Sequence, residues 1–288
     1  MKNKRVYIAF ESRSIGDTIV WIPYVSEFKT YFECEEVIVS TFHNWFFESE
    51  YKDLVFVEPG AIIKDIYAEY KIGCFDENRN LNKVDWRTRP LQQVVADILG
   101  IPFKEIKTRI KNFSSERQIN KKYICMSEHS TAGCKYWLRE NGWQSVVDYL
   151  IKEKDYKVVV ISKEKTFLNN IIDKTNNTFE ETIKTLKYCD FYIGVDSGPA
   201  WIVWAMGIPT IVISGFSKPF HEFVSNTERV INTYVCHGCF NDERYKFDRG
   251  DWYWCPLYKG TDRHFECSKK ITVEMVIEAI NRTTDKIK

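Results

Sequence analysis

The sequence predicts an α/β protein in which helices cover both faces of parallel sheets. Short apolar runs of strand length alternate with amphipathic stretches of helix length along the 288 residues, which is the pattern of such a fold. Polar or turn-forming residues bound each run. The runs also fall into two groups with a charged stretch between them, so we expect two sheets.

The first group of runs predicts strands and helices in the order strand, helix, three further strands, helix. The first strand is the apolar run RVYIAF, which begins at Arg5, and an amphipathic stretch follows it directly. Length separates the two kinds of element, because strands are short and helices need about ten or more residues. We expect strands at residues 5–10, 36–41, 54–59 and 70–75, and helices at residues 17–31 and 90–99.

The second group predicts a second sheet whose strands are separated by helices. Its runs include YICMS and KVVVIS, each with apolar residues throughout, as expected of parallel strands buried on both faces. A last amphipathic stretch closes the domain. We expect strands at residues 123–127, 157–162, 190–195 and 209–214, and helices near residues 143–152, 166–174, 179–188, 198–206 and 272–280.

A linker is expected at about residues 104–121, which hold many charges and few large apolar side chains. We therefore predict two doubly wound domains, residues 1–115 and 116–288, that face each other across a cleft. In such sheets ligands bind beyond the carboxyl ends of the strands. The loops after the strands are consequently where chemistry should be sought.

Composition excludes several classes of function. Hydrophobic residues make up 44% and charged residues 28%, with a net charge of +1, which argues against binding nucleic acid or anionic lipid through overall charge. No apolar run reaches the roughly 18 residues of a membrane span. Charged side chains such as Glu11 and Asp17 interrupt the N-terminal region where a signal peptide would be apolar. We expect a cytoplasmic protein.

The loop after the first strand, in the stretch ESRSIGDTIVW, carries Asp17 at or near the start of a helix. One interpretation is helix capping, which stabilises by about 1 kcal/mol. The other is catalytic, since an acid at the tip of a central strand could accept a proton from an acceptor hydroxyl. The residues alone leave both open.

Two loops of the second group have the composition of a phosphate site. The first, SEHSTAGCKYW, offers Ser127, Ser130, Thr131 and Lys135 with flexible backbone between them. Its glycine spacing is not that of a Walker A loop, which argues against a kinase or ATPase. The alternative is a polar loop whose hydroxyls cap the following helix.

The second of these loops is GVDSGPAW. Here Asp196, Ser197 and Gly198 lead into an apolar helix with Pro199 in its first turn. The helix N-terminus would favour an anion such as a diphosphate. The alternative is a well-capped core helix, in which Asp196 and Ser197 serve only as caps.

Four of the nine cysteines are concentrated near the C-terminus with the spacing C-x2-C-x15-C-x11-C. Because a cytosol keeps thiols reduced, this clustering predicts a four-cysteine metal finger, residues 236–267, with a structural zinc or iron ion. His237 or His264 could replace one ligand. Its aromatic side chains then need burial against another domain or subunit. The expected ligands are Cys236, Cys239, Cys255 and Cys267, and the aromatic residues are Phe240, Tyr245, Phe247, Trp252, Tyr253 and Trp254.

Together these motifs resemble the glycosyltransferase B-type (GT-B) heptosyltransferases, and most closely the bacterial autotransporter heptosyltransferases. The resemblance covers most of the chain and rests on SIGDTIVWIPYV, HSTAGCKYW and GVDSGPAWIVWAMGIPTIVI, together with the four-cysteine segment. It implies two Rossmann-like domains, an acceptor-side domain at residues 1–115 and a nucleotide-sugar-binding domain at 116–288. The implied reaction is an inverting transfer of heptose from ADP-heptose, or a similar nucleotide sugar, to Ser or Thr hydroxyls of an autotransporter-type protein.

The resemblance also implies roles for individual residues. Asp17 matches the catalytic base and Lys135 the cation that neutralises the donor diphosphate, so no catalytic divalent metal is expected. The cysteines match iron ligands of a finger that supports a large homo-oligomer, which favours iron over zinc. The implied donor-binding residues are Ser130, Thr131, Lys135, Asp196, Ser197 and Gly198.

One feature departs from that family, whose members usually carry an additional N-terminal domain that helps to hold the acceptor protein. Here the first strand begins at about Arg5, which leaves no room for it in this sequence. Two other functions remain as alternatives. One is a related transferase that acts on a glycan or lipid acceptor, and the other is an inactive scaffold stabilised by its metal. Retention of both Asp17 and Lys135 argues against the scaffold.

Overall fold

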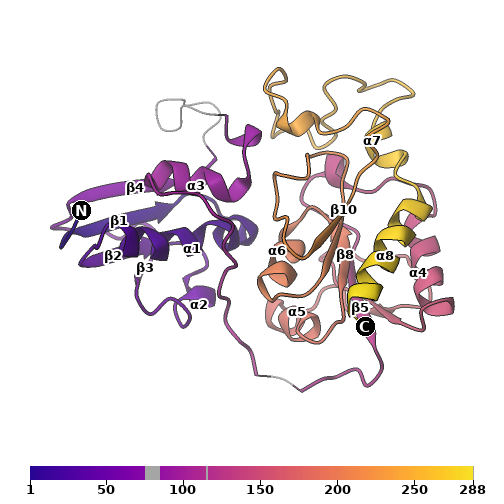
Figure 1. The fold of residues 1–288 in the computed structure, drawn as a ribbon, viewed down its shortest axis with the longest axis horizontal. Coiled ribbons are helices and arrows are strands. Elements are labelled where there is room, and N and C mark those ends of the chain that lie inside the picture. The colour runs from indigo at the N-terminus through magenta and orange to yellow at the C-terminus, as the bar shows by residue number, and fades with distance from the viewer. Residues whose placement is uncertain (75–84, 115, 288) are drawn as a thin grey trace. The chain divides into compact units, whose positions relative to one another are not determined.

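The computed structural model describes residues 1–74, 85–114 and 116–287 and divides into two compact units, Met1–Asn112 and Phe113–Lys288 (Figure 1). Both contain parallel strands covered by helices, so the predicted α/β class is confirmed. No helix in the described ranges is both long and apolar enough to cross a membrane.

The described part of the first unit contains a four-stranded parallel sheet in the order β3-β2-β1-β4. Strand β1 is central and buried, with Val6 opposite Val37 of β2 and Ala68 of β4. The helix that follows β1 therefore begins at the carboxyl end of a central strand. The elements are β1 (Arg5–Phe10), α1 (Ile15–Tyr31), β2 (Glu36–Ser40), α2 (Asn44–Phe47), β3 (Val55–Val57), β4 (Ala68–Ile72), a 3₁₀ turn (Trp86–Thr88) and α3 (Leu91–Leu99).

The described part of the second unit contains a six-stranded parallel sheet in the order β10-β9-β8-β5-β6-β7. Helices α4 and α8 pack on one another over a core of Val, Ile and Leu side chains. The strands are β5 (Tyr123–Ser127), β6 (Lys157–Val160), β7 (Ile172–Asp173), β8 (Tyr192–Val195), β9 (Thr210–Ile213) and β10 (Thr227–Val230). The helices are α4 (Gly142–Lys152), α5 (Phe179–Leu186), α6 (Gly198–Ala205), α7 (Glu266–Lys269) and α8 (Val273–Ile287).

The direction of winding reverses between β5 and β8. From β5 the chain adds β6 and β7 on one side of the sheet, and it then returns to add β8, β9 and β10 on the other. β5 and β8 are neighbours in the sheet, so the point of reversal lies between the loops that follow them. Such a switch point is where open parallel sheets bind ligands.

One predicted helix of this unit is wrong. Residues 166–174 form a loop that ends in the short strand β7 (Ile172–Asp173). The Thr166 hydroxyl accepts a hydrogen bond from the backbone N–H of Leu168, and Asn170 has a φ of 59°. A Thr side chain that bonds the local backbone and a residue in the left-handed region both compete with a helix. The strands β7 and β10 were not expected from the sequence.

The cysteine segment, residues 236–267, has little regular structure and follows β10 (Figure 1). The expectation that its aromatic side chains need another domain or subunit is wrong for Phe240, Phe247 and Trp254. These rings pack with Phe216 of the same unit, with centroid distances of 4.6 Å for Phe216 to Phe240 and 5.1 Å for Phe247 to Trp254. Phe247 meets Trp254 and Phe216 edge to face, an arrangement that is favourable for aromatic rings. Trp252 and Tyr253 stay largely exposed.

Candidate functional site

The two loops predicted to bind phosphate lie together at the switch point of the second sheet. Ser127 at the end of β5 pairs with Gly194 of β8, so both loops begin at the same edge. The Ser130 hydroxyl donates a hydrogen bond to the Asp196 carbonyl oxygen at 3.4 Å, and Lys135 Nζ lies 3.4 Å from Asp196 Oδ2. The first loop therefore supplies the cation and the second supplies its partner.

Asp196 is a buried carboxylate held in its charged form. Burial would raise its pKa, but the Lys135 ammonium, a hydrogen bond from Glu222 and the charge of Arg229 together hold the pKa well below its usual range. Burial works in the opposite direction on Lys135, whose pKa is nevertheless raised, chiefly by Asp196. Lys135 is 26% exposed and Asp196 only 7%, so the lysine is the member of the pair that a ligand can reach.

A second pair of ionisable side chains, Glu222 and Arg229, lies next to Asp196. Glu222 lies 2.6 Å from the Arg229 guanidinium, and both its carboxyl group and that of Asp196 contact the Ser217 hydroxyl. Burial raises the pKa of Glu222 to about 8; Arg229 opposes this shift and the nearby Asp196 carboxylate adds to it. The raised pKa favours the protonated form of Glu222 at neutral pH. In that form Asp196 is the main negative charge beside the cations Lys135 and Arg229.

Sequence reasoning missed Ser217, Glu222 and Arg229. They belong to no motif that was recognised, and they lie 20 or more residues after Asp196 in the chain. A signal was present, because Ser217 follows β9, the neighbour of β8, and the ends of neighbouring strands share one edge of a sheet. Glu128 was missed too: one of its carboxylate oxygens is buried without a hydrogen-bond partner among the described residues.

The remaining predicted donor-site residues are at the start of α6 and in the loop after β5. Ser197 is the N-cap residue of α6, but its side chain makes no capping hydrogen bond, so capping by that side chain is not the reason for its presence. A Cβ atom placed on Gly198 would meet nothing within 4 Å, which leaves open space at the first turn of the helix. Thr131 is exposed. Gly198 is partly exposed, whereas the Ser197 hydroxyl is buried without a hydrogen-bond partner among the described residues.

The loops after β5 and β6 also meet. His129 Nδ1 lies 3.0 Å from the Ser162 hydroxyl, and its Nε2 lies 3.8 Å from a Glu164 carboxylate oxygen. The Tyr136 hydroxyl donates a hydrogen bond to Glu164 at 3.3 Å. These contacts form a polar wall that extends from the Lys135 loop to Ser162.

Asp17 lies in the first unit, in the first turn of α1 at the carboxyl end of β1. The N-cap residue of this helix is Ser14, whose side chain accepts a hydrogen bond from the Asp17 backbone N–H. Asp17 is therefore not the capping residue. Its carboxylate accepts a hydrogen bond from the Ser12 hydroxyl at 2.5 Å and is half-buried, so it is oriented while remaining accessible.

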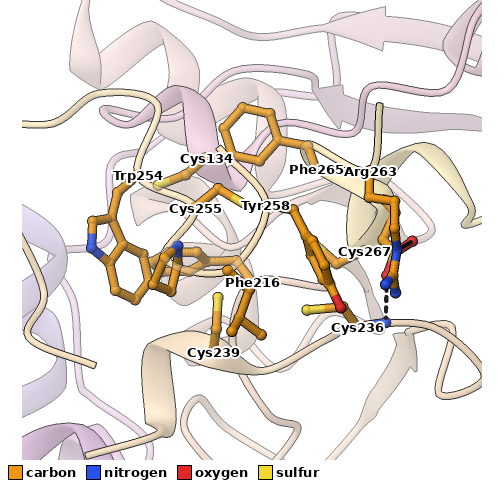
Figure 2. A pocket seen from close by; sticks show the side chains of 13 residues that line it. Cys134, Phe216, Cys236, Cys239, Trp254, Cys255, Tyr258, Arg263, Phe265 and Cys267 are labelled. Atoms are coloured by element: carbon orange, nitrogen blue, oxygen red, sulfur yellow. Dashed lines mark hydrogen bonds and ion pairs between the residues drawn. The ribbon is translucent and has the colours of Figure 1, made fainter. Parts of the chain in front are cut away.

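The four predicted metal ligands line one pocket, together with Cys134 of the loop after β5 (Figure 2). Among the residues that the structure describes, no group of three or more His, Cys, Asp and Glu side chains is arranged to hold a metal ion. The pocket lining consists mainly of the cysteines Cys134, Cys236, Cys239, Cys255 and Cys267 and the side chains Phe216, Trp254, Tyr258, Phe265 and Glu266.

The chemistry of these side chains nevertheless fits a metal. Burial raises the pKa of Cys267 to about 12, and the charge of a Cys236 thiolate adds to the shift. Burial likewise raises the pKa of Cys239, with a further contribution from Cys267. Thiols that hinder one another's ionisation lie close together, and a cation among them would remove that penalty. The side chains are suited to a metal, although their sulfur atoms do not form a completed site.

Comparison with known proteins gives consistent results. The family model described as glycosyltransferase family 9 (heptosyltransferase) matches residues 86–244. The chain is 36% identical to the autotransporter heptosyltransferase Aah of Escherichia coli, over 97% of this chain and 74% of that protein. It is 28% identical to BimC of Burkholderia thailandensis, described as an inactive autotransporter heptosyltransferase, over 96% of this chain and 68% of that protein.

Among solved structures, the chain is similar to TibC of enterotoxigenic E. coli H10407. One TibC crystal structure is described as a dodecameric iron-containing heptosyltransferase in complex with ADP-D-beta-D-heptose. It matches with a TM-score of 0.92 and 31% identity, over 100% of this chain and 78% of that one.

Proposed function

The chain belongs to glycosyltransferase family 9, the heptosyltransferases, and we propose that it is an inverting GT-B enzyme that transfers heptose from ADP-heptose to Ser or Thr hydroxyls of an autotransporter-type protein. The family resemblance expected from the sequence motifs is confirmed, and the protein is a glycosyltransferase. The observation that carries the proposal is the contact of Lys135 with Asp196 at the switch point of the second sheet. There a partly exposed cation can meet a diphosphate.

In this proposal the charges around Lys135 bind the donor. With Glu222 protonated, Lys135, Arg229, Asp196 and Glu222 carry one net positive charge, which a diphosphate can neutralise. Lys135 and the hydroxyls of Ser130 and Thr131 would contact the diphosphate, with Asp196 holding the lysine in position. Ser197 and Gly198 would receive the donor at the start of α6.

Asp17 is the proposed catalytic base. It removes the proton of the acceptor hydroxyl as the oxygen attacks the anomeric carbon of the heptose, and the bond between that carbon and the diphosphate oxygen breaks. Attack opposite the leaving group inverts the configuration. Lys135 stabilises the negative charge that develops on the leaving ADP, so this scheme needs no divalent cation.

The proposed cofactor is a structural iron ion, with zinc as the alternative. Cys236, Cys239, Cys255 and Cys267 would hold it, because they line one pocket and four thiolates suit either metal. When bound, the ion would cross-link a segment that has little regular structure. TibC, a dodecamer described as iron-containing, supports both the metal and a homo-oligomer for this chain. We propose that the protein acts in the cytoplasm.

Intact-mass analysis of an autotransporter fragment co-expressed with this protein tests the proposal. The two strains would differ only in the presence of ADP-heptose biosynthesis. We expect the fragment to gain mass in heptose units in the first strain and none in the second. An unmodified fragment in both strains would contradict the protein-acceptor proposal and would move the glycan or lipid acceptor ahead of it.

The inactive alternative has a specific relative behind it, since BimC is described as inactive. Donor hydrolysis or transfer by the purified protein, compared with its Asp17→Asn variant, separates an active enzyme from a scaffold. Equal, background rates for both proteins would favour the scaffold.

A further inference from the structure

We propose that the cysteine segment, residues 236–267, positions the diphosphate-binding loop of the donor site, residues 130–138, and thereby couples metal binding to donor binding. Trp252 and Ser268, the residue after Cys267, are the two positioning residues. This inference rests on the donor site proposed above. It assigns to the segment a role in the site beyond its own stability.

The first contact joins Trp252 to the backbone just before Lys135. A Cβ atom on Gly133 would lie 2.3 Å from Trp252 Nε1, so the indole packs directly on the glycine and no larger residue fits. The backbone N–H of Cys134 donates a hydrogen bond to the Trp252 carbonyl oxygen at 3.1 Å. The two residues that precede Lys135 are thus held by the cysteine segment.

The second contact lies just after Lys135. The Ser268 hydroxyl accepts a hydrogen bond from the Leu138 N–H at 2.7 Å and donates one to the Tyr136 carbonyl oxygen. Ser268 lies in α7, next to the predicted ligand Cys267. Lys135 is consequently bracketed on both sides by residues whose positions depend on the cysteine segment.

A third contact holds the partner side of the site. Gly215 packs on the Cys267 carbonyl, since a Cβ atom there would lie 2.2 Å from that oxygen. Its own carbonyl oxygen accepts a hydrogen bond from the Gly238 N–H at 2.8 Å. The loop from Gly215 contains Ser217, whose hydroxyl bonds Asp196. The segment therefore contacts both the loop that carries Lys135 and the loop whose Ser217 hydroxyl bonds Asp196.

The cysteine pocket itself includes the donor loop. Cys134 precedes Lys135 in sequence and lines the pocket with the four predicted ligands, and Figure 2 shows its side chain among theirs. Any rearrangement of the cysteines on metal binding must be accommodated by the wall to which Lys135 is attached. A segment with little regular structure depends on such cross-links for its order.

These contacts make donor affinity and metal affinity reciprocal. If the metal orders the segment and the segment orders the loop, the metal-loaded protein binds ADP more tightly because less ordering remains to be done. ADP must then slow the loss of metal by the same thermodynamic coupling. If the segment served only stability or assembly, metal binding would not change ADP affinity and ADP would not change the rate of metal loss.

The test is calorimetric titration of ADP into the purified full-length protein, as isolated and after partial removal of metal with a chelator, with metal content measured for each sample. The variants are Trp252→Ala and Ser268→Ala. Tyr234→Ala is the matched control, because Tyr234 is 98% exposed just before the segment. Lys135→Met reports on the donor site itself.

We expect Trp252→Ala and metal removal each to weaken ADP binding by about tenfold or more, since small misplacements of a binding group have effects of this size. Ser268→Ala, which removes only a hydroxyl, should weaken it by about threefold. It keeps the test valid if Trp252→Ala does not fold. Tyr234→Ala should match the wild type, and ADP should slow metal release to a chelator.

Two results would overturn the inference in distinguishable ways. If both variants and the metal-depleted protein bind ADP as the wild type does, while Lys135→Met does not, the positioning role is wrong and the donor site stands. If the wild type and Lys135→Met bind ADP equally weakly, the proposed donor site is wrong and the inference fails with it.

Discussion

Asp17 and Asp196 occupy equivalent places in the two units yet differ in their surroundings. Each follows a central parallel strand and lies at or beside the start of a helix. Asp196 is buried against Lys135 and held in its charged form. Asp17 is half-buried in the first turn of α1 and accepts a short hydrogen bond from Ser12.

Position in the fold therefore does not decide the role of an acid. A carboxylate whose pKa is held far below its usual range is a poor proton acceptor, so Asp196 serves as a fixed charge. A half-buried carboxylate that is oriented by a hydroxyl can meet a substrate, so Asp17 suits a base.

The largest effect is expected from Asp17→Asn. An amide cannot accept the proton of the acceptor hydroxyl, so the rate of transfer should fall about 10²- to 10⁴-fold. The rate is measured in a single turnover with an autotransporter fragment, followed by intact mass. A rate within about threefold of the wild type would show that Asp17 is not the base.

A somewhat smaller effect on the rate is expected from Lys135→Met, about 10²- to 10³-fold. The variant loses the cation that stabilises the leaving ADP and also leaves Asp196 buried without its main partner. Thermal unfolding should therefore occur at a lower temperature. Arg139→Met, which alters an exposed cation in the same region, is the control and should change neither quantity.

Each acid accepts a hydrogen bond from one serine hydroxyl, and removing these two hydroxyls should give two smaller effects that can be compared. Ser12→Ala removes the hydrogen bond to Asp17, and Ser217→Ala removes one to Asp196. A hydrogen bond to a charged group contributes about 1.5–3 kcal/mol, so effects of about 10- to 100-fold are expected. Ser12→Ala should lower the transfer rate at saturating donor, whereas Ser217→Ala should raise the donor KM. Identical effects of the two variants would erase the distinction between the acids.

The smallest effect is expected from Glu222→Gln and appears only at high pH. The pKa of Glu222 is raised to about 8, so its ionisation above that pH adds a negative charge beside Asp196 and should weaken donor binding several-fold. Glutamine cannot ionise, and its profile of donor KM against pH should stay flat there. If donor KM changes with pH in the same way in the wild type and in Glu222→Gln, the group that titrates is not Glu222.

The same pKa predicts a change in stability with pH. The folded-state pKa of Glu222 lies above its ordinary value of 4.5, so its contribution is fully present below that pH and is lost as the pH rises toward 8. The free energy of unfolding should therefore decline less steeply over this range in Glu222→Gln. Chemical denaturation at several pH values measures the slope.

Much of the fold could be predicted because it depends on local pattern. Apolar runs bounded by polar residues predicted β1 and β5 with their observed bounds, since a buried parallel strand leaves that signature. The expected helix at residues 166–174 was wrong because the Thr166 hydroxyl bonds the backbone N–H of Leu168 and Asn170 has a left-handed backbone conformation. Composition over a window does not register such single-residue competition.

The site was predictable only in part, for a related reason. Lys135 and Asp196 were found because each follows a strand, and parallel strands bring such residues to one edge of the sheet. Glu222 and Arg229 were not found, since their pairing with Asp196 depends on tertiary contacts that no spacing encodes. The burial of Trp254 against Phe216 was missed for the same reason.

The most direct test of the central claim is calorimetric titration of ADP into Asp17→Asn and Lys135→Met side by side, in one buffer at pH 7. We expect Asp17→Asn to bind ADP with wild-type affinity and Lys135→Met to lose at least about tenfold in affinity, because only the second change removes a donor contact. If Lys135→Met binds ADP with wild-type affinity, or if Asp17→Asn loses ADP affinity, the assignment of donor binding to Lys135 beside Asp196 and of catalysis to Asp17 is wrong.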